Sequence, residues 1–170
     1  MTTGFHEEQR FTQRWLWVLI ILNMLILAVI FGYGLIEQLI FGKPWGDRPV
    51  SDTTLILITS AVLLFSASMI YIFYSLRLIT EVRDDGLYIR FYPFRGTTIP
   101  YNSIRSCEAR IYKPLSEYGG WGIKYGRSGK AYNILGNRGV QLILDNDKRV
   151  LIGSQRADEL EKAIKQYCNC

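Results

Sequence analysis

Histidine and cysteine are scarce in this sequence, with one residue of the first type and three of the second. The single histidine, His6, precedes the first long apolar run, so the rest of the chain has none. A nucleophile activated by histidine is therefore excluded from the C-terminal half. A zinc site built from His and Cys also lacks its ligands. We expect no catalytic residues, no metal and no cofactor.

The three cysteines are too few and too badly spaced for a disulfide framework. Cys107, Cys168 and Cys170 cannot all pair within the chain, and the last two lie too close in sequence to link distant parts of a fold. Small secreted domains instead carry an even number of well-separated cysteines. The pattern predicts free thiols, as in cytosolic proteins.

Long basic runs are absent, since no more than two basic residues are adjacent anywhere, although the net charge is +5. Residues 81–170 hold 15 Lys and Arg against 10 Asp and Glu, and this excess equals the charge of the whole chain. A basic segment next to a membrane attracts anionic lipid headgroups. Nucleic-acid binding usually requires denser basic clusters, so we expect no nucleic-acid partner.

Charged residues are also absent from two long segments, 15–36 and 55–76, each of 22 residues. At about 1.5 Å per residue each helix would measure about 33 Å, which exceeds the roughly 30 Å hydrocarbon core of a bilayer. Both segments have aromatic residues near their ends, as membrane-spanning helices do at the lipid–water interface: Trp15, Trp17, Tyr33, Tyr71 and Tyr74. The sequence therefore predicts two transmembrane helices.

The remaining segments complete the predicted domain organisation: residues 1–14 an N-terminal tail, residues 37–54 an external loop, and residues 77–170 a C-terminal domain. The first span is too long for a cleaved signal peptide, and no cleavage site follows it. Four arginines lie close to the spans on the terminal side: Arg10, Arg14, Arg77 and Arg83. Positive charge favours the cytoplasmic side. We therefore predict a multi-pass protein of the plasma or inner membrane with both termini in the cytoplasm.

The spans contain one strongly polar residue, Asn23. An amide in hydrocarbon needs a hydrogen-bond partner, and the small residues Ser60, Ala67 and Ser68 offer surfaces for close approach of the second helix. We predict that these four residues pair the two helices as an antiparallel hairpin. A polar residue within a membrane can alternatively mark a transport path through oligomerised hairpins.

Alternating apolar and polar residues after Leu76 predict about seven strands: residues 78–83, 87–94, 97–100, 103–112, 131–135, 139–145 and 149–154. A C-terminal helix follows, with Ser154 as its predicted cap and an apolar face that would dock on the sheet: Leu160, Ala163, Ile164 and Tyr167. The class is α+β. Seven strands in meander order closed by a helix favour a pleckstrin-homology-like (PH-like) barrel, with a two-sheet sandwich as the alternative.

Particular motifs strengthen this interpretation. TEVRDDGLYIRFYPF (residues 80–94) and IPYNSIRS (residues 99–106) resemble the start of bacterial PH-like domains that follow a pair of membrane helices. The closing segment, residues 140–164, resembles the end of those domains. Within that group, YGGWGIK (residues 118–124) and GKAYNILGNRGVQL (residues 129–142) resemble a family of small prokaryotic membrane proteins of unknown function. The resemblance implies a fold and a topology, and no reaction.

Aromatic and basic residues alternate between residues 112 and 138. The predicted binding residues are Tyr112, Lys113, Tyr118, Trp121, Lys124, Arg127, Lys130, Tyr132 and Arg138. Such a surface can bind anionic headgroups, a protein partner or a second copy of the chain. In the structural alternative, Trp121 and Tyr132 fill the core of a small barrel.

We therefore expect a non-enzymatic, membrane-anchored PH-like module for interaction or scaffolding. The alternative function is a small oligomeric transport or channel component. An enzyme would require a pocket with a perturbed acid or base around Glu108, Glu117 or Arg110. The Asp pairs of the sequence lie in predicted turns, where Asp is favoured for backbone reasons.

Overall fold

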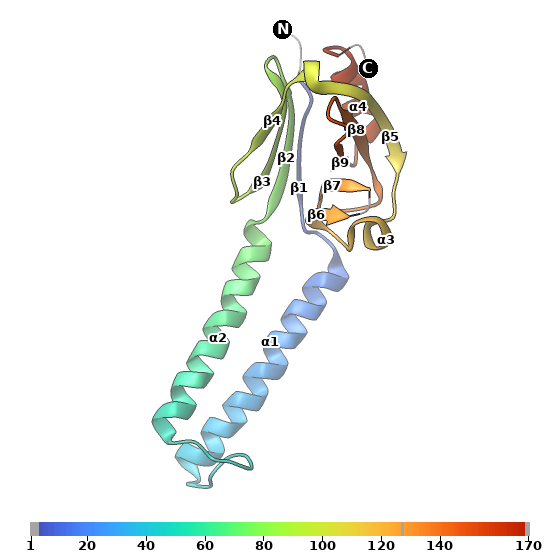
Figure 1. Ribbon diagram of the computed structural model, residues 1–170. Coiled ribbons are helices and arrows are strands. Elements are labelled where there is room, and N and C mark those ends of the chain that lie inside the picture. The colour runs from blue at the N-terminus through green and yellow to red at the C-terminus, as the bar shows by residue number, and fades with distance from the viewer. Residues whose placement is uncertain (1–3, 127, 169–170) are drawn as a thin grey trace. The chain divides into compact units, whose positions relative to one another are not determined.

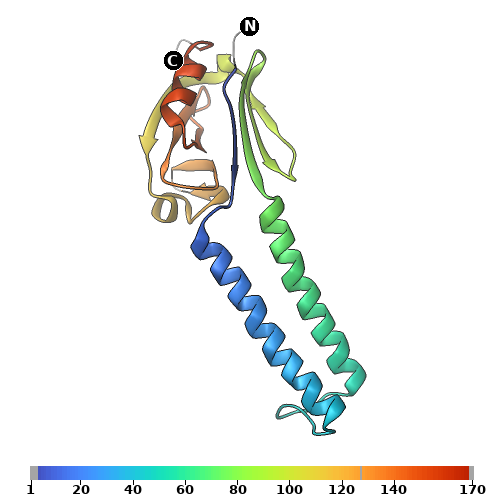
Figure 2. The same ribbon diagram turned by 180° about the vertical axis from the view of Figure 1, so that it is seen from behind.

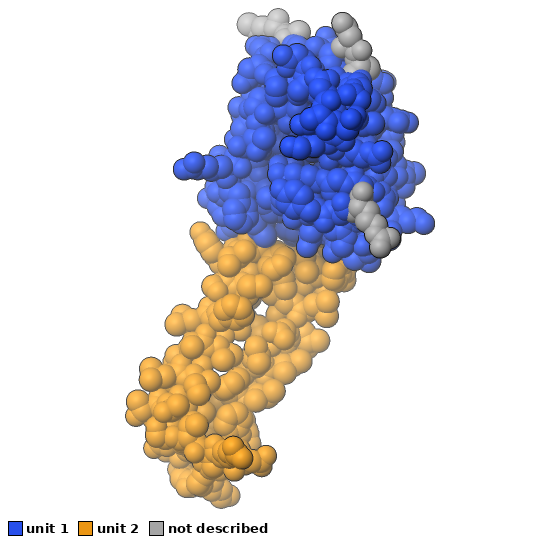
Figure 3. Space-filling view, in the orientation of Figure 1, with its two compact units in different colours: residues 1–11, 75–170 blue, residues 12–74 orange. Residues whose placement is uncertain are grey.

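The computed structural model describes residues 4–126 and 128–168 of the chain, which is an α+β protein. The chain divides into two compact units (Figure 3). Unit 1 combines Met1–Phe11 with Ser75–Cys170, and unit 2 is Thr12–Tyr74. Unit 1 therefore takes its chain from both sides of unit 2.

Unit 2 consists of two long apolar helices, α1 (Arg14–Leu35) and α2 (Asp52–Ser75), with a π-helical extension of α1 at Ile36–Ile40. Both helices are long and apolar enough to cross a membrane. Only 6% and 17% of the residues in their most apolar windows are buried. A helix from the core of a soluble domain would instead have its apolar side chains covered.

The turn between the two helices is closed by local contacts. The Gln38 side-chain amide donates hydrogen bonds to the Val50 carbonyl oxygen and to the Asp52 carboxylate, each at 2.8 Å. The Trp45 ring folds back onto α1, where it lies 5.9 Å from the Phe31 ring between centroids. Gly34 leaves room for it, since a Cβ there would lie 2.5 Å from the indole.

The first sheet of unit 1 is antiparallel, with strand order β1-β2-β3-β4 (Figure 1). Its strands are β1 (His6–Arg10), β2 (Arg77–Arg83), β3 (Gly86–Tyr92) and β4 (Thr97–Ile99). In the register of β1 and β2, His6 lies opposite Glu81 and Arg10 opposite Arg77. The N-terminal residues predicted to form a tail thus contribute a strand to the domain.

The second sheet has five strands in the order β5-β8-β9-β7-β6. They are β5 (Ile104–Ile111), β6 (Gly122–Gly126), β7 (Gly129–Asn133), β8 (Arg138–Leu144) and β9 (Arg149–Gly153). β7 and β9 are parallel, whereas the other pairs of neighbours are antiparallel. The predicted meander order is therefore wrong. The described residues form nine strands where about seven were predicted, and the segment between the predicted strands 103–112 and 131–135 contains a short helix, α3 (Pro114–Tyr118), and β6.

The core of unit 1 combines residues of both sheets with the C-terminal helix α4 (Ala157–Lys165), which contacts β5, β8 and β2. Its most deeply buried apolar side chains include Leu78, Leu87, Ile89, Val140, Leu142, Ile152, Leu160 and Ile164. The predicted helix is confirmed, but its predicted cap is wrong. Arg156 is the N-cap residue, and Ser154 lies two positions before it. The Ser154 hydroxyl accepts a 3.0 Å hydrogen bond from the Arg156 backbone amide and donates a 2.6 Å hydrogen bond to the Glu7 carboxylate.

Strand β1 links the first sheet to the segment between β9 and α4 (Figure 2). Glu7 also accepts a 2.9 Å hydrogen bond from the Gln155 backbone amide. The Gln9 side-chain amide donates to the Gly153 carbonyl oxygen at 2.8 Å. Both side chains are buried, so these polar contacts replace the apolar packing that an inward-facing strand residue normally provides.

Candidate functional site

The three predicted binding tyrosines, Tyr112, Tyr118 and Tyr132, are all buried in unit 1. Tyr112 is only 1% exposed, and its hydroxyl oxygen accepts a 3.1 Å hydrogen bond from the Asn133 side-chain amide. Its ring meets the edge of the Tyr118 ring, with the centroids 6.0 Å apart. Burial is the main cause that raises the pKa of both phenols. The structure thus places these three side chains in the interior, and they do not form an exposed aromatic surface.

Arg110 fixes α3 to the second sheet. Its guanidinium donates hydrogen bonds to the Glu117 carboxylate at 2.7 Å and to the Gln141 side-chain oxygen at 3.0 Å. The other Glu117 oxygen accepts from the Lys113 backbone amide at 2.7 Å. The hydrogen bond from Arg110 is the main cause that lowers the pKa of Glu117. A carboxylate that is ionised and accepts two hydrogen bonds holds α3 in place and is a poor general acid.

The other predicted binding residues do not form one continuous site. The Trp121 indole donates to the Gly136 carbonyl oxygen at 3.2 Å, and Arg138 forms a 2.9 Å ion pair with Asp158. Lys113 is exposed and Lys124 is half-buried. Arg127 lies outside the described residues.

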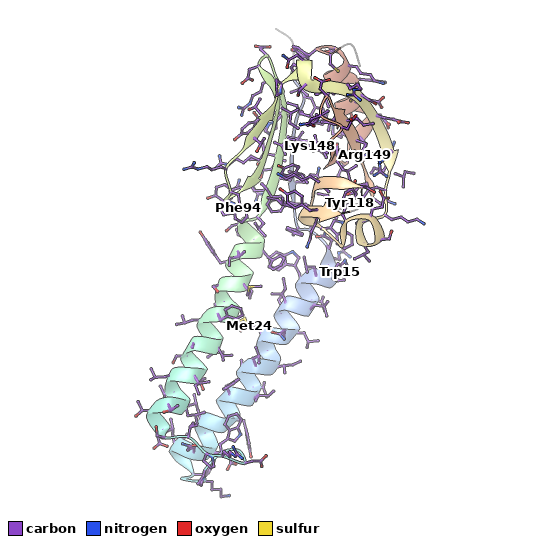
Figure 4. All side chains as sticks on the ribbon, viewed as in Figure 1. Trp15, Met24, Phe94, Tyr118, Lys148 and Arg149 are labelled. Atoms are coloured by element: carbon purple, nitrogen blue, oxygen red, sulfur yellow. The ribbon has the colours of Figure 1, made fainter. Side chains whose placement is uncertain are left out.

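A basic pocket involves Lys130 and residues that were not among those predicted. An open pocket of about 720 Å³ is lined by Tyr125, Gly126, Gly129, Lys130, Asp147, Lys148, Arg149 and Val150. Arg149 is the first residue of β9, and Lys148 precedes it in the turn after β8 (Figure 4). The parallel pairing of β7 with β9, in which Lys130 lies opposite Val150, brings them next to the β6–β7 hairpin. The sequence signal for this pocket was the adjacent basic pair next to a predicted turn. Lys130 comes close to this pair only when β7 pairs with β9 in the folded sheet.

The charges around this basic pocket are mostly positive. The Lys130 ammonium lies 4.6 Å from the centroid of the Tyr132 ring and 5.4 Å from that of Tyr125. Burial lowers the pKa of Lys130, but its interactions with the two tyrosines outweigh burial, so the pKa is raised. The only carboxylate lining the pocket within the described residues, that of Asp147, accepts a 2.7 Å hydrogen bond from Arg105.

Exposed apolar residues mark one end of unit 1. In both ribbon views α3 lies at the end of the unit at which β1 ends and β2 begins (Figures 1 and 2). Leu115 of α3 is 69% exposed, and Ile111 at the end of β5 is equally exposed. Phe94, in the segment after β3, is 57% exposed (Figure 4). Exposed apolar side chains of this size often mark a contact surface.

In unit 2, Asn23 of α1 lies at the same level as Ser66 of α2. Both line a cavity of about 260 Å³ between α1 and α2, together with Leu19, Ile20, Met24, Leu27, Phe65 and Met69. The three small residues predicted to pair the helices, Ser60, Ala67 and Ser68, are exposed on α2. The buried residues of α2 are instead Leu55, Thr59 and Ser66, so a different face of α2 is covered.

The cysteines differ from the prediction at one position. Cys107 is free and buried, as a cytosolic thiol can be. Burial, and secondarily the charge of Glu161, raises its pKa to about 12. Cys168 is disulfide-bonded, which corrects the prediction of a free thiol there, and Cys170 lies outside the described residues. Within residues 4–126 and 128–168, no group of three or more His, Cys, Asp or Glu residues is placed to hold a metal ion.

These features define a class: an α+β protein with two long apolar helices and a domain of two sheets. The chain belongs to a family of unknown function, DUF6141, whose family model matches residues 5–169. The match begins at Phe5 and therefore includes β1. No curated protein matches the chain. Membership of this family agrees with the expectation of a family of unknown function, and it assigns neither a PH-like fold nor a reaction.

Proposed function

We propose that this protein is a non-enzymatic, membrane-anchored binding module. Helices α1 and α2 would cross the plasma or inner membrane as a hairpin, and unit 1 would be a PH-like domain in the cytoplasm. Its ligand would be anionic, and the inner leaflet of the membrane is the nearest source. The observation that carries this proposal is the pairing of β1 with β2.

This pairing constrains the topology. β1 ends at Arg10, four positions before α1 begins at Arg14, and β2 begins at Arg77, two positions after α2 ends at Ser75. Because the two strands are hydrogen-bonded to each other, the N-terminal end of α1 and the C-terminal end of α2 would lie on the same side of a membrane. The arrangement supports two crossings with both termini on one side, and the arginines next to the spans favour the cytoplasmic side.

The PH-like assignment is supported by the two sheets of unit 1 and by α4, which contacts strands of both. A helix that covers the open corner between two small sheets protects their edges from aggregation. The parallel β7–β9 pair departs from the meander order of such domains.

The short connections to the helices support contact with lipid. An extended residue spans at most about 3.6 Å, so the strand ends at Arg10 and Arg77 stay within roughly 15 Å of the helix ends. Phe94, Ile111 and Leu115 are exposed at this end of unit 1. Apolar side chains next to basic ones bind an anionic membrane interface.

Anchoring and topology can be tested together by carbonate extraction and by labelling with a membrane-impermeant maleimide. The labelled positions would be Ser116→Cys in α3 and Arg48→Cys in the loop between the helices, both exposed. The background would carry Cys168→Ser and Cys170→Ser. We expect the protein to stay in the carbonate pellet, with Ser116→Cys labelled only in inverted vesicles and Arg48→Cys only in spheroplasts. Release by carbonate, or labelling of both positions from one side, would contradict the proposal.

Lipid binding requires a separate measurement. In nanodiscs, hydrogen exchange of α3 and of the segment after β3 should slow when phosphatidylglycerol is added to phosphatidylcholine. A Leu115→Ser variant should lose most of this protection, whereas Ser116→Ala should retain it. If hydrogen exchange does not change and a defined protein co-purifies with the chain in detergent, the ligand would be a protein partner and not the lipid.

A further inference from the structure

We propose that the protein forms a parallel homodimer through the exposed side of α1, with Asn23 of each copy hydrogen-bonded to Asn23 of the other. This inference rests on the membrane-crossing hairpin of the proposed function, and it names a partner for that anchor: a second copy of the chain. The observation behind it is the Asn23 side chain, which is exposed on α1 and makes no hydrogen bond with any residue of the described ranges.

The first argument is the hydrogen-bonding demand of this amide. A primary amide has two N–H donors and a carbonyl oxygen that accepts. Backbone N–H groups inside a helix already donate to carbonyl oxygens four positions earlier, so α1 itself offers the Asn23 oxygen no donor. Ser66 of α2 lines the same cavity as Asn23, but its hydroxyl donates a 2.9 Å hydrogen bond to the Val62 carbonyl oxygen. In hydrocarbon no water replaces a missing partner, so a donor from outside the hairpin would stabilise the protein.

The second argument is that Asn23 belongs to an exposed stripe along α1. The stripe follows alternating spacings of four and three residues, the repeat by which two long helices pack along their length. Its members are all exposed, and all but Asn23 are apolar or aromatic: Leu19, Asn23, Ile26, Ile30 and Tyr33. Ile20, Met24 and Leu27 are more covered and line the cavity between α1 and α2. The stripe therefore runs beside the contact with α2 and is open to another helix.

The third argument is the identity of that helix. Copies of the chain share one orientation in a membrane, so Asn23 lies at the same depth in each copy. A two-fold axis along the membrane normal then brings every residue of the stripe opposite its own counterpart. The amide is self-complementary, because each Asn23 can donate to the oxygen of the other. A single asparagine in such a repeat sets the register of parallel coiled coils, and asparagine also promotes association of membrane helices. A lipid tail would cover the stripe but leave the amide unpaired.

Disulfide crosslinking in membranes tests the interface directly. The full chain would carry Cys168→Ser and Cys170→Ser, with a new cysteine on the stripe (Ile26→Cys) or one position away at nearly the same depth (Leu25→Cys). Both native side chains are exposed. Oxidation with copper phenanthroline should link most of Ile26→Cys as a dimer and little of Leu25→Cys. Linkage of Leu25→Cys to the same or a greater extent, no linkage of either, or linkage of Ile26→Cys to a different protein would overturn the proposal.

Variants of Asn23 test the hydrogen bond. Förster transfer between labelled copies in liposomes, measured at increasing dilution with lipid, gives the dissociation constant of the dimer. Asn23→Leu should raise this constant on the order of tenfold, whereas Asn23→Gln keeps the amide and should retain most of the association. The control Ser68→Ala should leave it unchanged, because the Ser68 hydroxyl already donates to the Phe65 carbonyl oxygen at 2.7 Å. If Asn23→Leu associates as tightly as the wild type, Asn23 is not the contact and the proposal is rejected.

Failure of the dimer and failure of the anchor give different results. A protein that stays in the carbonate pellet with the expected maleimide labelling, but yields no Ile26→Cys dimer, would contradict the dimer alone. Release by carbonate would contradict the proposed function and, with it, pairing within a membrane.

Discussion

Tyr112 and Tyr125 show that residues with the same sequence pattern can have opposite roles. Both alternate with lysine or arginine in the segment that predicts a binding surface. Tyr112 contributes to the core with a hydrogen-bonded hydroxyl, whereas Tyr125 is mostly exposed next to Lys130. Tyr112 comes directly after β5 at the start of the α3 connection, and Tyr125 lies in an edge strand, β6. Their positions in the sheet decide the difference.

Substitutions at these two positions should therefore affect stability very differently. Tyr112→Phe leaves the buried Asn133 amide without its acceptor and should cost about 1–3 kcal/mol. Tyr112→Ala adds a cavity and should cost about 3–5 kcal/mol. The control Tyr125→Ala should stay within about 0.5 kcal/mol of the wild type. Thermal or denaturant unfolding of the protein in detergent measures these values, and equal losses at both positions would contradict the assignment of Tyr112 to the core.

The Cys107 thiol should be inert in the folded protein. Burial raises its pKa from the ordinary 9.0 to about 12, so at pH 8 it has on the order of a thousandfold less thiolate than an exposed thiol. We expect maleimide to label Cys107 only after denaturation, as read by peptide mapping. Rapid labelling of the native protein would show that the site opens.

The same shift predicts a dependence of stability on pH. The unfolded thiol ionises above about pH 9 while the folded thiol stays neutral, so the free energy of unfolding should fall as the pH rises from 9 towards 12. Other groups also titrate in this range. The measurement is therefore the difference in pH slope between the wild type and Cys107→Ala, which should lose this contribution. Identical slopes would contradict the shift.

At the scale of the elements, β1 is the strand that the sequence pattern does not predict. Its inward-facing positions include Glu7 and Gln9, which lack the apolar character that normally identifies a strand. Their partners, Gly153, Ser154 and Gln155, lie more than a hundred positions away in the chain. Local pattern could not show these contacts.

Removal of the Glu7 carboxylate should destabilise unit 1. Glu7→Ala leaves the Ser154 hydroxyl and the Gln155 amide without an acceptor, at about 1–3 kcal/mol for the buried hydroxyl and less for the part-buried amide. Glu8→Ala is the matched control, because Glu8 forms only partly exposed ion pairs with Arg10 and Arg77, worth about 0–1 kcal/mol. Unfolding transitions of the two variants give the comparison. A larger loss for Glu8→Ala would show that β1 is not held by its inner face.

At the scale of the whole molecule, the domain is discontinuous in sequence. Unit 1 needs residues from before and after the helices, since β1 covers the edge of β2. An uncovered strand edge exposes backbone donors and acceptors that promote aggregation. The boundary predicted at residue 77 therefore omits one strand of the domain.

The discontinuity makes a direct prediction for isolated fragments. Residues 77–170 alone should aggregate or unfold at low temperature. Residues 4–11 joined by a short Gly/Ser linker to residues 76–170 should fold, because Arg10 and Arg77 are partners in adjacent antiparallel strands. Far-UV circular dichroism during heating, together with two-dimensional NMR, measures both. Equal melting temperatures would show that β1 is dispensable.

The sequence by itself determined the elements that local periodicity encodes. The two uncharged runs at 15–36 and 55–76 agree closely with α1 and α2, and the strand and turn pattern located β2, β3, β8, β9 and α4. These elements are readable because burial of one face imposes a repeat on neighbouring residues. The candidate site was only partly predictable: Lys130 was identified, whereas Lys148 and Arg149 were not.

Only the tertiary structure decided which distant segments become neighbours. It paired β1 with β2 across the helices and β7 with β9 in parallel, and these pairings formed the domain and its basic pocket. It also placed Tyr112, Tyr118 and Tyr132 inside, although each has a charged or polar residue next to it in the sequence. The physical reason is that backbone hydrogen bonds between strands form in the same way whichever side chains the strands carry. Burial and pairing across long separations depend on the whole chain, whereas the period of a helix or strand depends on a few adjacent residues.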